Sequence, residues 1–216
     1  APVVKEVLGP DAESVALAWR FPGLASKDFE VLQVVSQVLY NGKAGLIDLD
    51  LNQQQKVLNS YGYPMGLADY SAFILGGLPK QGQTLEEVKD LLLNEIKKLR
   101  AGEFDEKMLQ ANINNFKLYE LQSMESNEGR ADIFVNSFIN GTNWEDEVTA
   151  IDRMAKLTKE DIVAFADKYL KEDNYAVVYK KQGKDPNEKK MTKPEITPIV
   201  SNRDVASPFL TSIQEN

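Results

Sequence analysis

The sequence predicts an α+β fold, a mostly antiparallel sheet covered on one face by a run of helices. Two observations predict it. Segments in which large apolar residues alternate with other residues lie towards both ends of residues 1–182, as expected of strands. Between them the apolar residues repeat with a period of 3.6 through five segments, as in amphipathic helices. Strands grouped on either side of a helical run are typical of the α+β class.

The stretch from Ser14 to Asn59 is the one around which the rest of the chain is organised. Its strand should bury one face, with Trp19 in the core, and Pro22-Gly23 ends it. A helix follows from the capping residue Ser26 to Asn41-Gly42, and a short helical segment covers Gly45–Leu51. The alternating residues that predict the strand are Val15, Leu17, Trp19 and Phe21.

Three further strands are predicted. Residues 56–63 and 69–76 flank a turn signal at Pro64-Met65-Gly66, and residues 175–180 form the last strand. The segment 69–76 is apolar on both faces, which indicates a central strand. A fifth or sixth strand in residues 1–9 or in the tail is left open.

Capping residues mark the predicted helices. Thr84 with Glu87 and Thr158 with Asp161 each form a capping-box pattern. Asp105, Ser126 and the segment around Trp144 begin the other three helices. In the helix after Ser126 the apolar residues fall on one face: Ala131, Phe134, Val135, Phe138 and Ile139.

The chain divides near residue 182. Residues 1–182 form a single α+β domain, whereas 183–216 hold four of the nine prolines, have balanced charge and show no sustained period. This tail is interpreted as an extended, proline-containing linker. It should be partly docked, because Ile196, Ile199, Val200, Phe209 and Leu210 are too apolar for a free linker in water.

The composition excludes several classes of site. The net charge of −8 argues against nucleic acid or an anionic membrane as the main partner, and no apolar run is long enough to span a bilayer. The chain has no histidine and no cysteine, so a catalytic dyad or triad that uses either is excluded. A catalytic zinc is improbable, because only carboxylates remain as ligands. We therefore predict no catalytic residue, metal site or cofactor in this chain.

The first residues favour a piece of a longer polypeptide or a processed chain, since the sequence starts Ala-Pro-Val-Val without Met or a signal segment. The cellular compartment is not specified by these features; periplasm and cytoplasm both remain open.

The strand ending in Phe21-Pro22-Gly23, the helix after it and the segment Gly45-Leu46-Ile47 with two further leucines resemble a structural repeat of the insulinase/pitrilysin superfamily of zinc metallopeptidases, which includes mitochondrial processing peptidase. The resemblance runs from about Ser14 to Lys181. It implies a domain of the kind that lacks the zinc motif H-x-x-E-H, with zinc in the first domain of the parent polypeptide.

The resemblance also supplies a test of position within the parent. The last domain of long members places an Arg and a Tyr against the substrate, and the matching residues here are Asn52 and Asn59. Asparagine has neither the guanidinium charge nor the phenol. The chain therefore fits better as the second domain of the first half, followed by a connector to the second half.

Other candidate residues have simpler interpretations. Glu86-Glu87 and Glu145-Asp146-Glu147 lie in predicted first helical turns, where carboxylates favour the helix dipole. Gln53-Gln54-Gln55 suits a solvated helix end, and the sequon at Asn140 coincides with a helix end and receives no function. Gly76-Gly77 lacks the Lys of a phosphate loop. The aromatic residues Tyr61, Tyr63, Tyr70 and Phe73 could line a peptide groove or pack in the core.

The function implied is that of a non-catalytic domain that packs on the zinc-bearing and second-half domains and helps to wall a chamber for peptide substrates. The alternative is a scaffold or binding subunit of a larger complex without peptidase activity. An H-x-x-E-H motif upstream of Ala1 in the parent reading frame would decide between the two.

Overall fold

The computed structural model describes residues 1–185, 191–198 and 205–214. The chain forms two units, Ala1–Lys184 and Asp185–Asn216. The second unit contains one described helix, α8 (Pro208–Gln214), in a segment for which the sequence predicted none. The predictions for Ile199 and Val200 lie outside the described residues.

A five-stranded sheet forms the body of the first unit, in the order β1-β5-β2-β4-β3. Among the described strands, β1 and β5 form the one parallel pair and the other three pairings are antiparallel, which confirms the predicted mostly antiparallel sheet. The strand predicted to be central, β4, lies between β2 and β3. The strands are β1 (Val3–Gly9), β2 (Ser14–Pro22), β3 (Asn59–Met65), β4 (Tyr70–Leu78) and β5 (Ala176–Gln182).

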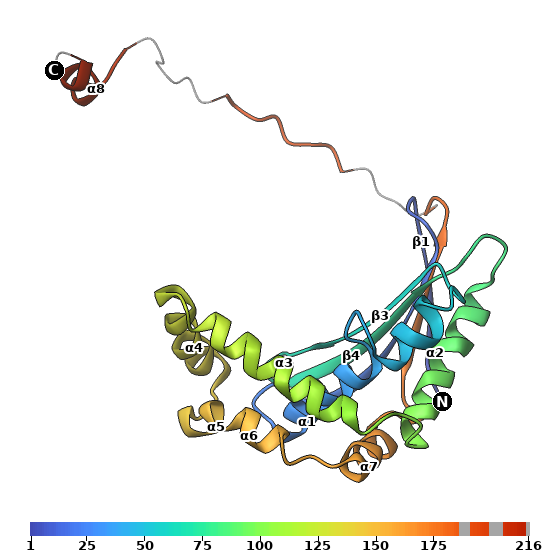
Figure 1. Cartoon of the computed structure of the whole chain (residues 1–216). Coiled ribbons are helices and arrows are strands. Elements are labelled where there is room, and N and C mark those ends of the chain that lie inside the picture. Colours follow the sequence, from blue (N-terminus) through green and yellow to red (C-terminus); the bar gives the residue numbers. More distant parts are fainter. Residues whose placement is uncertain (186–190, 199–204, 215–216) are drawn as a thin grey trace. The chain divides into compact units, whose positions relative to one another are not determined.

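Helices cover one side of this sheet, as predicted (Figure 1). Helices α1, α2 and α7 pack directly on strands, and α3 packs on α1. The predicted caps Ser26, Thr84, Ser126 and Thr158 are all observed. The helices are α1 (Lys27–Leu39), α2 (Leu85–Arg100), α3 (Lys107–Ser123), α4 (Asn127–Asn140), α5 (Trp144–Val148), α6 (Ala150–Met154) and α7 (Lys159–Tyr169).

The core lies between the sheet and these helices, and one face of β2 is its centre. The four alternating residues of β2 are at most 1% exposed. Trp19 is among them, which confirms its predicted burial, and its indole N–H donates to the Lys171 carbonyl at 3.1 Å. This bond satisfies the polar end of a buried aromatic residue. The ring of Tyr175 lies 5.4 Å from that of Trp19, so the chain from α7 into β5 closes over the strand.

Several predicted boundaries were wrong. The strand predicted at 56–63 is β3, Asn59–Met65, so Pro64 and Met65 belong to the strand and not to the turn. Proline is tolerated there because β3 is an edge strand, whose outer N–H groups need no partner strand. The strand predicted at 69–76 is β4, Tyr70–Leu78.

Residues 3–9 form β1, the fifth strand whose presence the sequence left open. Two other elements differ from the prediction. The helical segment predicted at Gly45–Leu51 is mostly a π-helix, η1 (Asp48–Asn52). The helix predicted around Trp144 is two short helices, because Thr149 leaves helical geometry between α5 and α6.

The stability of the first unit should depend on Trp19 far more than on the chain's other tryptophan, Trp144. Trp19→Ala should lower the free energy of unfolding by about 3–5 kcal/mol, because it leaves a cavity beneath the helices. Trp144→Ala should cost less than about 1 kcal/mol, since that side chain is 43% exposed. Urea unfolding of both variants measures the difference. A loss below about 1 kcal/mol for Trp19→Ala would mean that this face of β2 is not the core.

Candidate functional site

The candidate site is the face of the sheet that carries no helix of the first unit (Figure 1). Strand register decides which residues occupy it, because successive side chains point to opposite faces. The buried residues of β2 pair with Ser71, Phe73, Leu75 and Gly77 of β4, so the residues between them form the other face. The resulting surface consists of Ala16, Ala18 and Arg20 of β2, Tyr70, Ala72, Ile74 and Gly76 of β4, and Tyr61, Tyr63 and Met65 of β3.

This register separates the four aromatic residues singled out in the sequence. Phe73 is fully buried and belongs to the core. Tyr61, Tyr63 and Tyr70 lie on the uncovered face, where Tyr63 is 46% and Tyr70 58% exposed. The rings of Tyr61 and Tyr63 stack with centroids 6.1 Å apart. Three of the four are therefore available to a ligand.

The glycine pair Gly76-Gly77 fits both layers of the structure closely. A Cβ on Gly76 would lie 2.2 Å from the ring of Tyr61, so its absence lets that ring lie flat on the sheet. A Cβ on Gly77 would lie 2.4 Å from a methyl group of Val88, so its absence lets α2 approach the core face. The two glycines thus allow close packing on both faces of β4.

Polar groups along this face give it hydrogen-bonding capacity. The guanidinium of Arg20 lies 4.8 Å from the centroid of Tyr70, beside a cavity of about 530 Å³ that Lys168 and Tyr169 also line. Burial raises the pKa of the Tyr61 phenol above its usual value, and the neighbouring Tyr63 adds to the rise. Tyr61 is therefore protonated at neutral pH and can donate a hydrogen bond.

Asn52, one of the two residues at substrate-contact positions of the resembled proteins, has a structural task. Its side-chain amide donates to the Ser60 carbonyl at 2.8 Å, and its oxygen accepts from the Ser60 N–H and hydroxyl at 2.8 and 2.9 Å. These bonds fasten η1 to β3. Asn59 is exposed at the start of β3. In the glutamine triplet, Gln53 donates to the Lys43 carbonyl.

The acidic stretches lie in first helical turns, as predicted. Glu87 completes the capping box of α2, and Glu86 forms an ion pair with Lys89. Asp146 in the first turn of α5 forms an ion pair with Lys27. In the part of the chain that the structure describes, no group of three or more Asp, Glu, His or Cys side chains is placed to hold a metal ion.

Comparison with known proteins identifies the family. The model of the peptidase M16 inactive domain matches residues 1–116, which is more than half of the chain. The chain belongs to this family. The finding confirms the resemblance to the zinc metallopeptidase superfamily, and the family is described as an inactive peptidase domain.

Two relatives come from Helicobacter pylori. Zinc protease PqqE is 27% identical over 178 residues, which are 80% of this chain and 39% of PqqE. The crystal structure of a protease from the same organism superposes with a TM-score of 0.77 and 22% identity, over 82% of this chain and 43% of that one. The chain thus spans about two fifths of the length of these relatives.

A third similar protein is a solved structure described as an inactive peptidase domain of a zinc protease. The inactive peptidase domain of a Bordetella parapertussis protein superposes with a TM-score of 0.70 and 17% identity, over 79% of this chain and 93% of that one.

Among the described residues of the present chain, none of the helices has the length and hydrophobicity to cross a membrane.

Because Asn52 holds η1 against β3, we expect alanine substitutions of Asn52 and Asn59 to have unequal effects on stability. Asn52→Ala should lower the free energy of unfolding by about 1–3 kcal/mol, because it removes the partners of buried Ser60. Asn59→Ala should change it by less than about 0.5 kcal/mol, since Asn59 is exposed. Thermal and urea unfolding measure both values. Equal losses would show that the bonds to Ser60 do not stabilise the fold.

Proposed function

We propose that this M16 inactive domain binds extended peptide on its uncovered sheet face, as a non-catalytic wall of the substrate chamber of a zinc protease. The observation that carries the proposal is the aromatic platform, which consists of Tyr61 and Tyr63 of β3 and Tyr70 of β4. The strand register places these residues on the face that has no helical cover. Hydrolysis would take place elsewhere in the parent protein, where a metal-bound water attacks the peptide bond.

The relatives support the zinc-protease part of the proposal. PqqE is named a zinc protease, and the region of it that matches this chain is only 39% of its length. This chain has no histidine, and carboxylates alone are an unusual ligand set for catalytic zinc. We therefore assign the zinc to another domain of the parent polypeptide.

The chemistry of the uncovered face suits a peptide in extended conformation. Stacked tyrosine rings offer large apolar contact area with phenol groups that can donate to peptide carbonyls. The small side chains Ala16, Ala18 and Ala72 between them keep the surface flat enough for a backbone to approach.

The domain's place in the parent is also a proposal. Since Asn52 is used to hold β3, it does not reach outward as the substrate-contacting Arg of the last domain would. This favours the second domain of the first half, with residues 183–216 as the connector that leads to the second half.

A labelled peptide tests the peptide-binding face. The probe is a fluorescein-labelled ten-residue peptide of alternating apolar and polar residues, followed by fluorescence anisotropy against the full chain. Tyr63→Ala should weaken binding at least fivefold, which corresponds to about 1 kcal/mol, because the side chain is a half-exposed part of the platform.

The control is Leu58→Ala, which removes a 67% exposed apolar side chain that lies outside the platform. It should leave the affinity unchanged. Equal affinities for the Tyr63 and Leu58 variants, or no saturable binding by the unmodified chain, would contradict the proposal.

A further inference from the structure

Helix α4 presents most of its apolar residues to solvent, and its one buried residue is a serine. The sequence correctly placed five apolar residues on one face of this helix, but that face points outward. Phe138 is 89%, Ile139 69% and Phe134 60% exposed. The buried side of the helix instead holds Ser137, which is 7% exposed and donates from its hydroxyl to the Thr142 carbonyl. This arrangement is the reverse of an ordinary surface helix.

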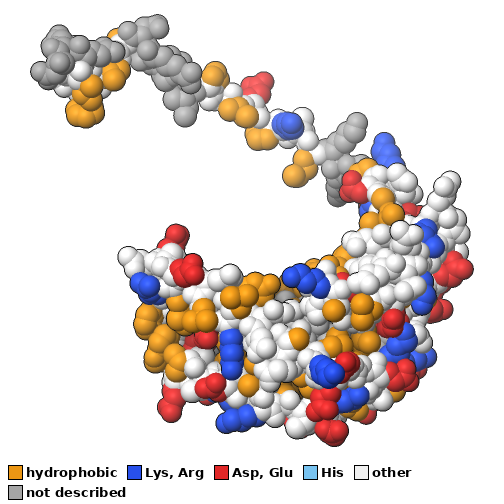
Figure 2. All heavy atoms as spheres, viewed as in Figure 1, with side chains coloured by type: hydrophobic (Ala, Val, Ile, Leu, Met, Phe, Trp, Pro, Cys, Tyr) orange, Lys and Arg blue, Asp and Glu red, His pale blue; other side chains and the backbone are white. Residues whose placement is uncertain are grey.

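The exposed apolar surface continues onto the neighbouring elements. We call residues 117–148, which comprise the end of α3, α4 and α5, the arm. A monomer seldom exposes so many large apolar side chains in one place unless they form an interaction site. Figure 2 shows apolar side chains over α4 and α5 at the left of the view, bordered by acidic ones. Each of these ten residues is at least 37% exposed: Leu118, Tyr119, Leu121, Met124, Phe134, Val135, Phe138, Ile139, Trp144 and Val148.

The arm also carries most of the chain's charge. It has seven carboxylates and two basic residues, a net charge of −5 out of −8 for the whole chain. Asp146 forms ion pairs with Lys27 and Arg153. The other six carboxylates form no ion pair with a described residue: Glu120, Glu125, Glu128, Asp132, Glu145 and Glu147.

A groove runs between the three helices of the arm. A cavity of about 440 Å³ lies between the end of α3, α4 and α5, with Met124, Ile133 and Val148 among its lining residues. The rings of Phe134 and Trp144 stack in its wall with centroids 4.4 Å apart. Glu120 and Glu147 also line it, so the apolar groove has a mostly acidic border.

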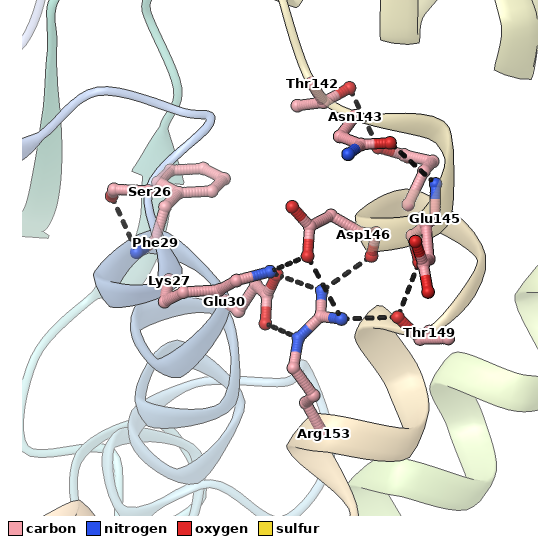
Figure 3. Close-up of polar contacts among 11 residues, drawn as sticks. Ser26, Lys27, Phe29, Glu30, Thr142, Asn143, Glu145, Asp146, Thr149 and Arg153 are labelled. Carbon is pink, nitrogen blue, oxygen red and sulfur yellow. Dashed lines mark hydrogen bonds and ion pairs between the residues drawn. The ribbon is translucent and has the colours of Figure 1, made fainter.

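Polar contacts hold the arm on the body of the domain, so the groove has a defined position. Figure 3 shows Lys27 and Glu30 of α1 facing Asp146 and Arg153 of α5 and α6. Arg153 donates to both carboxylate oxygens of Glu30, at 2.9 and 2.5 Å, and to the backbone carbonyl of Asp146 at 2.6 Å. These contacts anchor α5, one wall of the groove, to α1.

We propose that the arm docks a basic amphipathic helix presented by a partner protein, with the apolar side chains of that helix in the α3–α4–α5 groove and its Lys and Arg residues against the acidic border. Helices bind grooves of this kind through apolar anchors three or four residues apart. The unpaired carboxylates select positive charge, because opposite charges across an interface favour encounter and like charges oppose it. The same argument disfavours a second copy of this chain, whose arm would bring another −5.

Two synthetic peptides test the docking surface. The probe is a labelled 14-residue amphipathic helix of Leu and Lys, and its counterpart replaces every Lys by Glu. The Leu/Lys peptide should bind the full chain at least tenfold more tightly than the Leu/Glu peptide. Binding should weaken on raising the salt concentration, because the acidic border is exposed. Equal binding of the two peptides would overturn the proposal.

Phe138→Asp locates the binding. It removes the most exposed of the apolar residues on α4 and adds a negative charge, so a binding loss can only report the apolar contact. We expect at least tenfold weaker binding of the Leu/Lys peptide. The control Leu58→Asp adds the same charge at a residue that is 67% exposed outside the arm, and should leave the affinity unchanged or slightly higher. Equal effects of both substitutions would overturn the proposal.

Sedimentation velocity and vesicle flotation test two other possible occupants of the arm, a second copy of this chain and a lipid surface. The chain alone should stay monomeric, and neutral phosphatidylcholine vesicles should not retain it. A dimer that Phe138→Asp dissociates would show that the surface belongs to a second copy of this chain. Retention on the vesicles that the same substitution abolishes would show a lipid-binding surface. Either result would overturn the proposal.

Discussion

Burial of one face of β2 is the constraint on which the rest of the structure depends. The four residues on that face are at most 1% exposed, and strands β4 and β5 flank β2 on its two sides. Helices α1, α2 and α7 all pack on this strand. A sheet with one apolar face must cover it, and here the cover comes from helices on that side alone. The other face is consequently left free for the surface that we propose binds peptide.

Close packing on the covered side also determines details of the free side. Because Gly77 has no side chain, α2 can pack on the core face of β4. Because the adjacent Gly76 has none, the ring of Tyr61 can lie on the opposite face. Asn52 and Ser60 fix the π-helical turn η1 against the strand that carries Tyr61 and Tyr63. The aromatic platform thus rests on the same strands and hydrogen bonds that stabilise the fold.

Much of this fold could be predicted from the sequence because the signals are local. Alternation in β2 and the capping boxes at Thr84 and Thr158 need no knowledge of the partners. Strand β1 could not be identified in this way. It is an edge strand that pairs in parallel with β5, more than 170 residues away, and its residues are exposed or nearly so on both faces. Its sequence therefore lacks the alternation of a half-buried strand.

The surfaces were harder to predict than the elements. The apolar stripe of α4 was identified, but periodicity cannot tell whether a stripe faces the core of its own domain or another molecule. Likewise the sequence alone could not show that Phe73 lies in the core and that Tyr61, Tyr63 and Tyr70 lie on the uncovered face. The face on which each residue lies depends on the strand register across β3 and β4. The role of Asn52 depends on a contact with Ser60 that forms only when η1 packs on β3.

The most direct measurement of the central claim, that this domain is a non-catalytic part of a zinc protease, is the metal content and peptidase activity of the purified chain. After exposure to micromolar zinc and dialysis, we expect substoichiometric zinc and no cleavage of a fluorogenic peptide, since the chain has no histidine or cysteine. Stoichiometric zinc that resists a chelator, with cleavage that disappears on substituting a single Asp or Glu, would contradict the account.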